Sequence, residues 1–126
     1  TLTGAVVKAL GYELSGLMTQ DNALRSALTT AGEQSGDEVW SLPLDARLKK
    51  QTESAIADLC NTPTNNAAIS ASAAWLLHHF CPADIPWAHL DVSGTALWRE
   101  GGKSVASGRP IPLLMQHLLN DLDIRE

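Results

Sequence analysis

An apolar stripe between clear helix boundary signals is the sequence feature that most restricts the fold of this chain. The stripe has the spacing of one face of an amphipathic helix and consists of Leu24, Ala27, Leu28 and Ala31. Residues 19–22 before it supply N-cap candidates, and Gly32 and Gly36 are expected to end the helix. Such a helix gains most of its stability from burying its stripe, so the sequence predicts a layered domain.

Extended and helical segments alternate on both sides of this helix. Strands are predicted over residues 12–18, 39–44, 55–60 and 87–92. Further helices are predicted over residues 4–10, 45–54 and 67–80, and from Pro110 or Ile111 onward. Loops rich in Gly, Ser, Asn or Pro are predicted over residues 61–66 and 93–108. The alternation indicates an α/β architecture, with residues 1–126 forming part of one domain.

Two of the later helices also carry apolar stripes. In the helix over residues 67–80 the stripe consists of Ile69, Ala73, Leu76, Leu77 and Phe80. In the last helix the stripe that we expect to be buried consists of Ile111, Met115, Leu118 and Leu122.

The composition excludes several classes of partner. The 126 residues carry a formal net charge of −5, and this acidic balance argues against a nucleic-acid surface, which needs clustered Lys or Arg. No apolar run approaches the roughly 18–20 residues that span a membrane. Cys60 and Cys81 are isolated from each other and fit no metal spacing, so a reduced, cytoplasmic setting is expected.

The stretch Pro86–Ala96 is the strongest candidate for a functional segment. It reads as a short apolar strand that runs into a Gly-containing turn, and ligands in α/β proteins are usually met where strands end. His89 and Asp91 lie two residues apart, so they point to the same face of the strand. They could act as a base and its orienting group, or as a buried polar pair that positions the following turn. No G-x-S-x-G elbow accompanies them.

Other polar motifs are incomplete. The adjacent His78 and His79 point about 100° apart on a helix and cannot easily share a metal. The segment Gly101-Gly102-Lys103-Ser104 resembles the end of a phosphate loop, but Leu97 stands where the first glycine is required. Arg109, ahead of the last helix, either binds an anion there or forms a surface ion pair. The residues alone therefore give no complete catalytic set.

Three separated segments carry a family resemblance. The first is Thr1-Leu2-Thr3-Gly4-Ala5, and the second is Ala57-Asp58-Leu59-Cys60-Asn61-Thr62. The third is the run from Trp87 to Thr95, followed by Ser107-Gly108-Arg109-Pro110. Together they resemble the C-terminal part of the catalytic domain of the leucine aminopeptidase family, the cytosolic dinuclear-metal aminopeptidases.

The resemblance implies a three-layer α/β/α sandwich on a mixed sheet, in a hexameric, cytoplasmic enzyme. Members of the family release N-terminal amino acids from peptides with two divalent metal ions, which are Mn, Zn or Mg. The family's metal ligands and catalytic residues match positions that precede Thr1. The resemblance therefore assigns neither a catalytic residue nor a metal ligand to this chain.

What the resemblance carries over is the wall of a substrate pocket. The segment that runs along the peptide matches Thr1, Leu2, Thr3 and Gly4. The side that receives the residue after the scissile bond matches Asn61 and Thr62. The turn that lines the pocket for the N-terminal side chain matches Ser93, Gly94 and Ala96. Small residues at this turn leave room for a Leu-like side chain. The alternative is a non-catalytic structural or interaction module that lacks the metal site.

Overall fold

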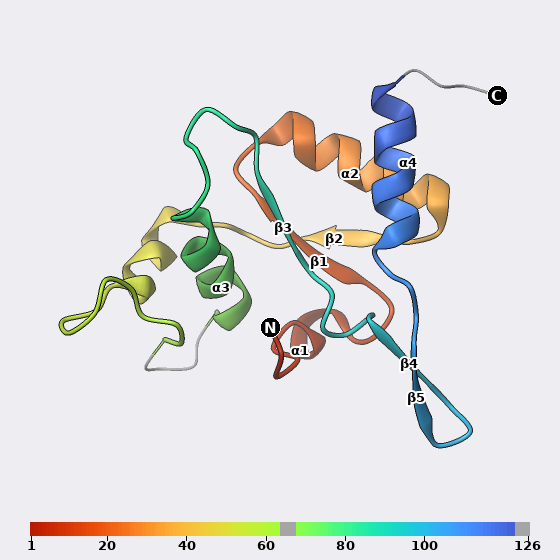
Figure 1. Cartoon of the computed structure of the whole chain (residues 1–126), viewed down its shortest axis with the longest axis horizontal. Helices are drawn as coiled ribbons and strands as arrows, with labels where there is room; N and C mark the ends of the chain where they lie inside the picture. The colour runs from red at the N-terminus through yellow and green to blue at the C-terminus, as the bar shows by residue number, and fades with distance from the viewer. Residues whose placement is uncertain (64–67, 123–126) are drawn as a thin grey trace.

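A mixed three-stranded sheet forms the centre of the protein in a computed structural model, which describes residues 1–63 and 68–122 (Figure 1). The central strand is β1 (Ser15–Thr19). It pairs in parallel with β2 (Val39–Ser41) and antiparallel with β3 (Ala88–Asp91). The predicted α/β class with a mixed sheet is confirmed.

Neighbouring residues of β1 pack into separate cores on the two faces of the sheet. Leu17 packs with Leu28 of α2 (Asn22–Ser35) and Leu113 of α4 (Ile111–Asp121). Met18 packs with small residues of α3 (Ile69–His78), namely Ala71 and Ala74. Side chains alternate between the faces of a strand, so consecutive apolar residues require cover on both sides. Helices cover both faces, which confirms the predicted three layers.

The boundaries of α2 follow from local hydrogen bonds and backbone preference. The Asp21 carboxylate accepts a hydrogen bond from the backbone N–H of Leu24 at 2.8 Å, and Gly36 ends the helix in the left-handed conformation. The prediction that Gly32 ends the helix is wrong. A Cβ at Gly32 would lie 3.0 Å from the Asp37 carbonyl oxygen and 3.4 Å from Leu113. Gly32 thus lets the segment before β2, and also α4, approach the helix closely.

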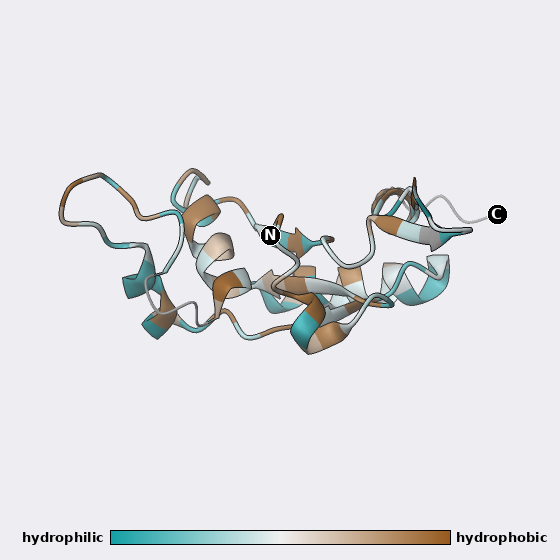
Figure 2. Cartoon of the chain, turned by 90° about the horizontal axis from the view of Figure 1, so that it is seen from below, coloured by the Kyte–Doolittle hydropathy of each residue, from teal (hydrophilic) through white to brown (hydrophobic). Residues whose placement is uncertain are grey.

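The strand predicted over residues 55–60 does not form. This run lies on the loop at the far left of Figures 1 and 2, and Ile56 is 98% exposed. The Ser54 hydroxyl accepts hydrogen bonds from the backbone N–H groups of Ile56 and Ala57 at 3.3 and 3.1 Å. Such local side-chain bonds turn the backbone and compete with strand pairing. The preceding 45–54 region contains the short 3₁₀ helix η1 (Ala46–Thr52).

A β-hairpin occupies much of the segment that was predicted to be a loop over residues 93–108. Strand β4 (Leu97–Glu100) pairs antiparallel with β5 (Lys103–Ala106). The two residues between them, Gly101 and Gly102, have φ of 55° and 78°. A Gly-Gly pair with positive φ at both positions is the signal of a two-residue hairpin turn.

The expected orientation of the last helix is wrong. In α4, the stripe of Ile111, Met115, Leu118 and Leu122 is 52–67% exposed, and the buried residue is Leu113. In α3, Leu77 lies on the exposed side, while Ala71, Ala74 and Trp75 are buried. Phe80, which lies beyond the end of α3, is also exposed. Near the N-terminus, the short helix α1 (Val7–Leu10) ends at Gly11 as predicted. Among the described residues, no helix is both long and apolar enough to cross a membrane.

Candidate functional site

The turn after β3 packs against the end of α1. Its backbone is closed by hydrogen bonds from the N–H groups of Thr95 and Ala96 to the Val92 carbonyl oxygen, at 3.0 and 2.8 Å. The buried hydroxyls of Ser15 and Thr95 lie 2.6 Å apart and tie the turn to β1. A Cβ at Gly94 would lie 2.6 Å from the Gly11 carbonyl oxygen. Only glycine fits at this point.

Asp91 joins three segments of the chain. Its carboxylate is buried and accepts hydrogen bonds from the Thr1 hydroxyl at 2.9 Å and the Ser93 hydroxyl at 2.8 Å. The Thr1 nitrogen lies 3.1 Å from Oδ1 of this carboxylate. Burial raises the pKa of Asp91, but the hydrogen bonds from Ser93, Thr1 and Ser70 outweigh this effect and hold the pKa below its ordinary value of 3.8.

His89 and Asp91 do not form the base-and-orienter pair that their spacing allowed. No hydrogen bond joins them in the part of the chain that the structure describes, and His89 Nε2 is buried without a partner there. The imidazole instead lies 6.3 Å from the Trp87 ring, centroid to centroid. Burial lowers the pKa of His89, and the nearby Asp91 charge offsets this only in part. The arrangement fits the alternative in which Asp91 positions the turn.

The lowered pKa of His89 predicts a loss of stability in mild acid. Below the ordinary pKa of 6.5, the unfolded chain takes up a proton that the folded chain resists, so stability falls as the pH falls. We expect the thermal unfolding midpoint of the full-length protein to fall between pH 7.5 and 5.5, and to fall less in His89→Phe. If the midpoint falls equally in both proteins, His89 is not the source of the loss of stability in acid.

A cavity of about 630 Å³ opens beside the turn. It lies between the turn, the segment after α1 and the hairpin, and is lined by Tyr12, Glu13, Ser93, Gly94, Leu97, Trp98, Ser104 and Arg109. Cavities of this size, with apolar walls and a few polar groups, bind small ligands and side chains. Of the nine residues predicted for the site, Ser93 and Gly94 line it. The hairpin residues were missed because the hairpin itself was not predicted.

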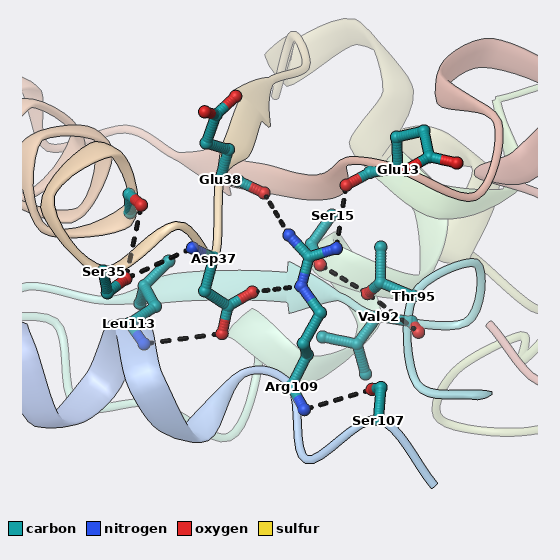
Figure 3. A network of polar contacts seen from close by, with 11 residues as sticks. Glu13, Ser15, Ser35, Asp37, Glu38, Val92, Thr95, Ser107, Arg109 and Leu113 are labelled. Atoms are coloured by element: carbon teal, nitrogen blue, oxygen red, sulfur yellow. Dashed lines mark hydrogen bonds and ion pairs between the residues drawn. The ribbon is translucent and has the colours of Figure 1, made fainter. Parts of the chain in front are cut away.

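Arg109 forms a buried ion pair that fixes the start of α4 (Figure 3). Its Nε lies 2.5 Å from Asp37 Oδ1, and its terminal nitrogens donate to the carbonyl oxygens of Glu13 and Glu38 at 2.8 and 3.4 Å. The other Asp37 oxygen accepts from the backbone N–H of Leu113 at 3.4 Å. The expected surface ion pair is therefore a buried one, with Asp37 2% and Arg109 13% exposed.

The other predicted site residues divide into two groups. Thr1 lies beside the turn, with its hydroxyl 3.3 Å from that of Ser93. The segment from Thr1 to Gly4 forms its own turn, closed by a 3.0 Å hydrogen bond from the Gly4 N–H to the Thr1 carbonyl oxygen, and Leu2 projects into solvent. Asn61 and Thr62 are exposed in the loop after η1, and within residues 1–63 and 68–122 no hydrogen bond joins them to the other seven.

The described residues do not supply a metal centre. Across residues 1–63 and 68–122, no three His, Cys, Asp or Glu side chains gather closely enough to hold a metal ion. Cys60 and Cys81 are both free thiols. The described residues thus bring hydroxyls and a buried carboxylate next to a cavity.

A known peptidase family matches most of this chain. Residues 1–115 match the cytosol aminopeptidase family, catalytic domain. The chain belongs to this family. It is 50% identical over 120 residues to a probable cytosol aminopeptidase of Bordetella avium, and 47% identical over the same length to one of Psychromonas ingrahamii. Each alignment covers 95% of this chain but only 23% of the relative.

Solved structures agree with this assignment. A mutant of tomato leucine aminopeptidase superposes with a TM-score of 0.81 at 31% identity, over 93% of this chain and 23% of that one. The bottromycin maturation enzyme BotP superposes with a TM-score of 0.87 at 30% identity, over 95% of this chain and 27% of that one. The resemblance seen in the sequence is confirmed.

Proposed function

We propose that the full-length protein is a metal-dependent aminopeptidase that releases N-terminal amino acids from peptides, with a preference for Leu-like side chains. The observation that carries the proposal is the family match over residues 1–115, joined to a turn with a cavity beside it. The similarity to the tomato leucine aminopeptidase supports the preference. In this chain the substrate would meet pocket walls rather than catalytic groups.

The proposed walls are the nine residues that the resemblance assigned. Three lie on the turn after β3, where Ser93 and Ala96 have small side chains and Gly94 has none. The Thr1–Gly4 segment would run along the peptide backbone, and it contacts the turn through Thr1 and Ser93. Asn61 and Thr62 would receive the residue after the scissile bond. Small residues and exposed backbone groups suit a wall that a substrate approaches closely.

The metal ions of the proposed enzyme have no ligand set among the described residues. We infer two divalent ions, Mn, Zn or Mg, in the full-length protein, and a second BotP structure that contains Mn supports a metal of this kind. That structure superposes with a TM-score of 0.81. When bound, such ions polarise the scissile carbonyl and lower the pKa of water. No chemical step is assigned to residues of this chain.

The proposal also covers location and assembly. A cytoplasmic setting is supported by the names of the relatives, which are cytosol aminopeptidases. A homo-hexamer is proposed from the resemblance, and light scattering of the full-length protein in solution tests it. A non-catalytic structural or interaction module that lacks the metal site is the alternative.

Hydrolysis of aminoacyl chromogenic substrates tests the function. With Mn²⁺, the full-length protein is expected to cleave Leu and Met substrates faster than Ala and Gly substrates, and a chelator is expected to abolish turnover. The isolated 126-residue chain is the matched control and should show no turnover. Faster cleavage of Gly or Ala would contradict the preference, and turnover by the isolated chain would contradict the assignment of catalytic groups elsewhere.

A further inference from the structure

Asp91 lies at the point where the two proposed pocket walls meet. Its backbone pairs with Gly16 of the central strand, so the sheet fixes where its side chain starts. The side chain then accepts hydrogen bonds from Thr1, at one end of the first wall, and from Ser93, at one end of the second. A group held by a rigid element is well placed to set the distance between two segments that it contacts.

Each contact controls the course of a whole segment. Thr1 begins the turn that is closed by the Gly4 N–H, so its position sets the direction in which Leu2 and Thr3 project. Ser93 is the first residue inside the turn that is closed by the hydrogen bond from the Ala96 N–H to the Val92 carbonyl oxygen. The Ser93 backbone N–H adds a second bond to the same carboxylate oxygen, at 3.3 Å. Fixing these two residues therefore fixes both walls.

The chemistry of these contacts requires an ionised carboxylate. Asp91 Oδ1 lies within 3.3 Å of two donors, the Ser93 hydroxyl and the Ser93 N–H, while Oδ2 accepts from the Thr1 hydroxyl at 2.9 Å. An asparagine amide has only one acceptor oxygen, and hydrogen bonds to a charged group are about twice as strong as neutral ones. Asparagine would keep the shape of Asp91 but would lose some of its hydrogen bonds and weaken the others.

We propose that Asp91 is a positioning residue, whose carboxylate holds the Thr1–Gly4 segment and the Ser93–Ala96 turn at the separation that a substrate requires. This inference rests on the proposed function, because it is there that these segments become substrate walls. Asp91 touches neither substrate nor metal in this role. Loss of the Asp91 carboxylate should therefore weaken substrate binding and reduce the preference for Leu-like side chains more than it slows the chemical step.

Two variants of the full-length protein test the proposal. Asp91→Ala removes every contact, and Asp91→Asn restores the shape and one acceptor. KM for a Leu substrate is expected to rise about tenfold or more in Asp91→Ala and by less in Asp91→Asn, with kcat within about threefold. Ser72→Ala is the matched control. It removes another buried hydroxyl, which donates to Gln51 Oε1 at 2.7 Å, and should leave KM unchanged.

Amide hydrogen exchange provides a second readout that needs no activity. Exchange at residues 2–4 and 93–96 should accelerate about tenfold in Asp91→Ala and less in Asp91→Asn, relative to Ser72→Ala. If neither variant changes exchange there, or if kcat falls at constant KM, the positioning role is wrong. If the wild-type protein hydrolyses no aminoacyl substrate, the proposed function fails, and exchange still decides whether Asp91 holds the segments together. Should Asp91→Ala not fold, Asp91→Asn alone carries both comparisons.

Discussion

Replacing Arg109 by methionine is expected to lower the free energy of unfolding of the full-length protein by about 3–5 kcal/mol. The variant leaves the Asp37 carboxylate buried and without its cation, and it removes two hydrogen bonds to backbone carbonyl groups (Figure 3). An uncompensated buried charge is costly because water no longer solvates it. The shift in the midpoint of urea-induced unfolding measures the effect.

Two further variants separate charge from packing at this pair. Arg47→Met is the matched control, because Arg47 forms its ion pair with Asp45 at the surface, with its side chain 90% exposed. It should leave the midpoint unchanged, since exposed ion pairs are screened by water. Adding Asp37→Asn to Arg109→Met should recover part of the loss by removing the unpaired charge. Equal shifts for Arg109→Met and Arg47→Met would show that the buried ion pair contributes no more to stability than the exposed one.

Gly94→Ala is expected to be the second strongly disruptive substitution, at about 1–3 kcal/mol. The added methyl group would lie 2.6 Å from the Gly11 carbonyl oxygen and 3.1 Å from a Val7 methyl group. The first of these is a backbone atom, so relief requires the turn and the end of α1 to move apart. Because Gly94 lies in a proposed pocket wall, the same displacement should raise KM for Leu substrates. Unfolding midpoint and KM measured on one preparation check both effects.

Gly16→Ala offers a comparison of crowding by backbone with crowding by side chains. A methyl group at Gly16 would lie 2.9 Å from a Val6 methyl and 3.3 Å from a Leu42 methyl, both at the ends of side chains. Side-chain ends can rotate away, whereas a carbonyl group is fixed by its peptide unit. We therefore expect a smaller loss of stability than for Gly94→Ala. The reverse order would show that the core around β1 tolerates less movement than the turn.

The candidate site could be predicted from the sequence only in part. The turn after β3 was identified because Gly and small residues follow an apolar strand, and the structure places Ser93 and Gly94 beside a cavity. The hairpin side of the cavity was missed, although Gly101 and Gly102 carried the signal for it. The role of Asp91 depends on Thr1, which is 90 positions away in the sequence. No local pattern encodes a contact across that separation.

What the sequence determined by itself was the set of features that depend on near neighbours. The N-cap at Asp21, the helix end at Gly36 and the α/β alternation follow from local hydrogen bonds and φ preferences. Only the tertiary structure decided which side of α4 is buried. Leu113 packs against Gly32 and the sheet, so the apolar stripe from Ile111 to Leu122 faces outward. Periodicity shows that a helix has an apolar face, but burial depends on the surfaces that distant segments bring to it.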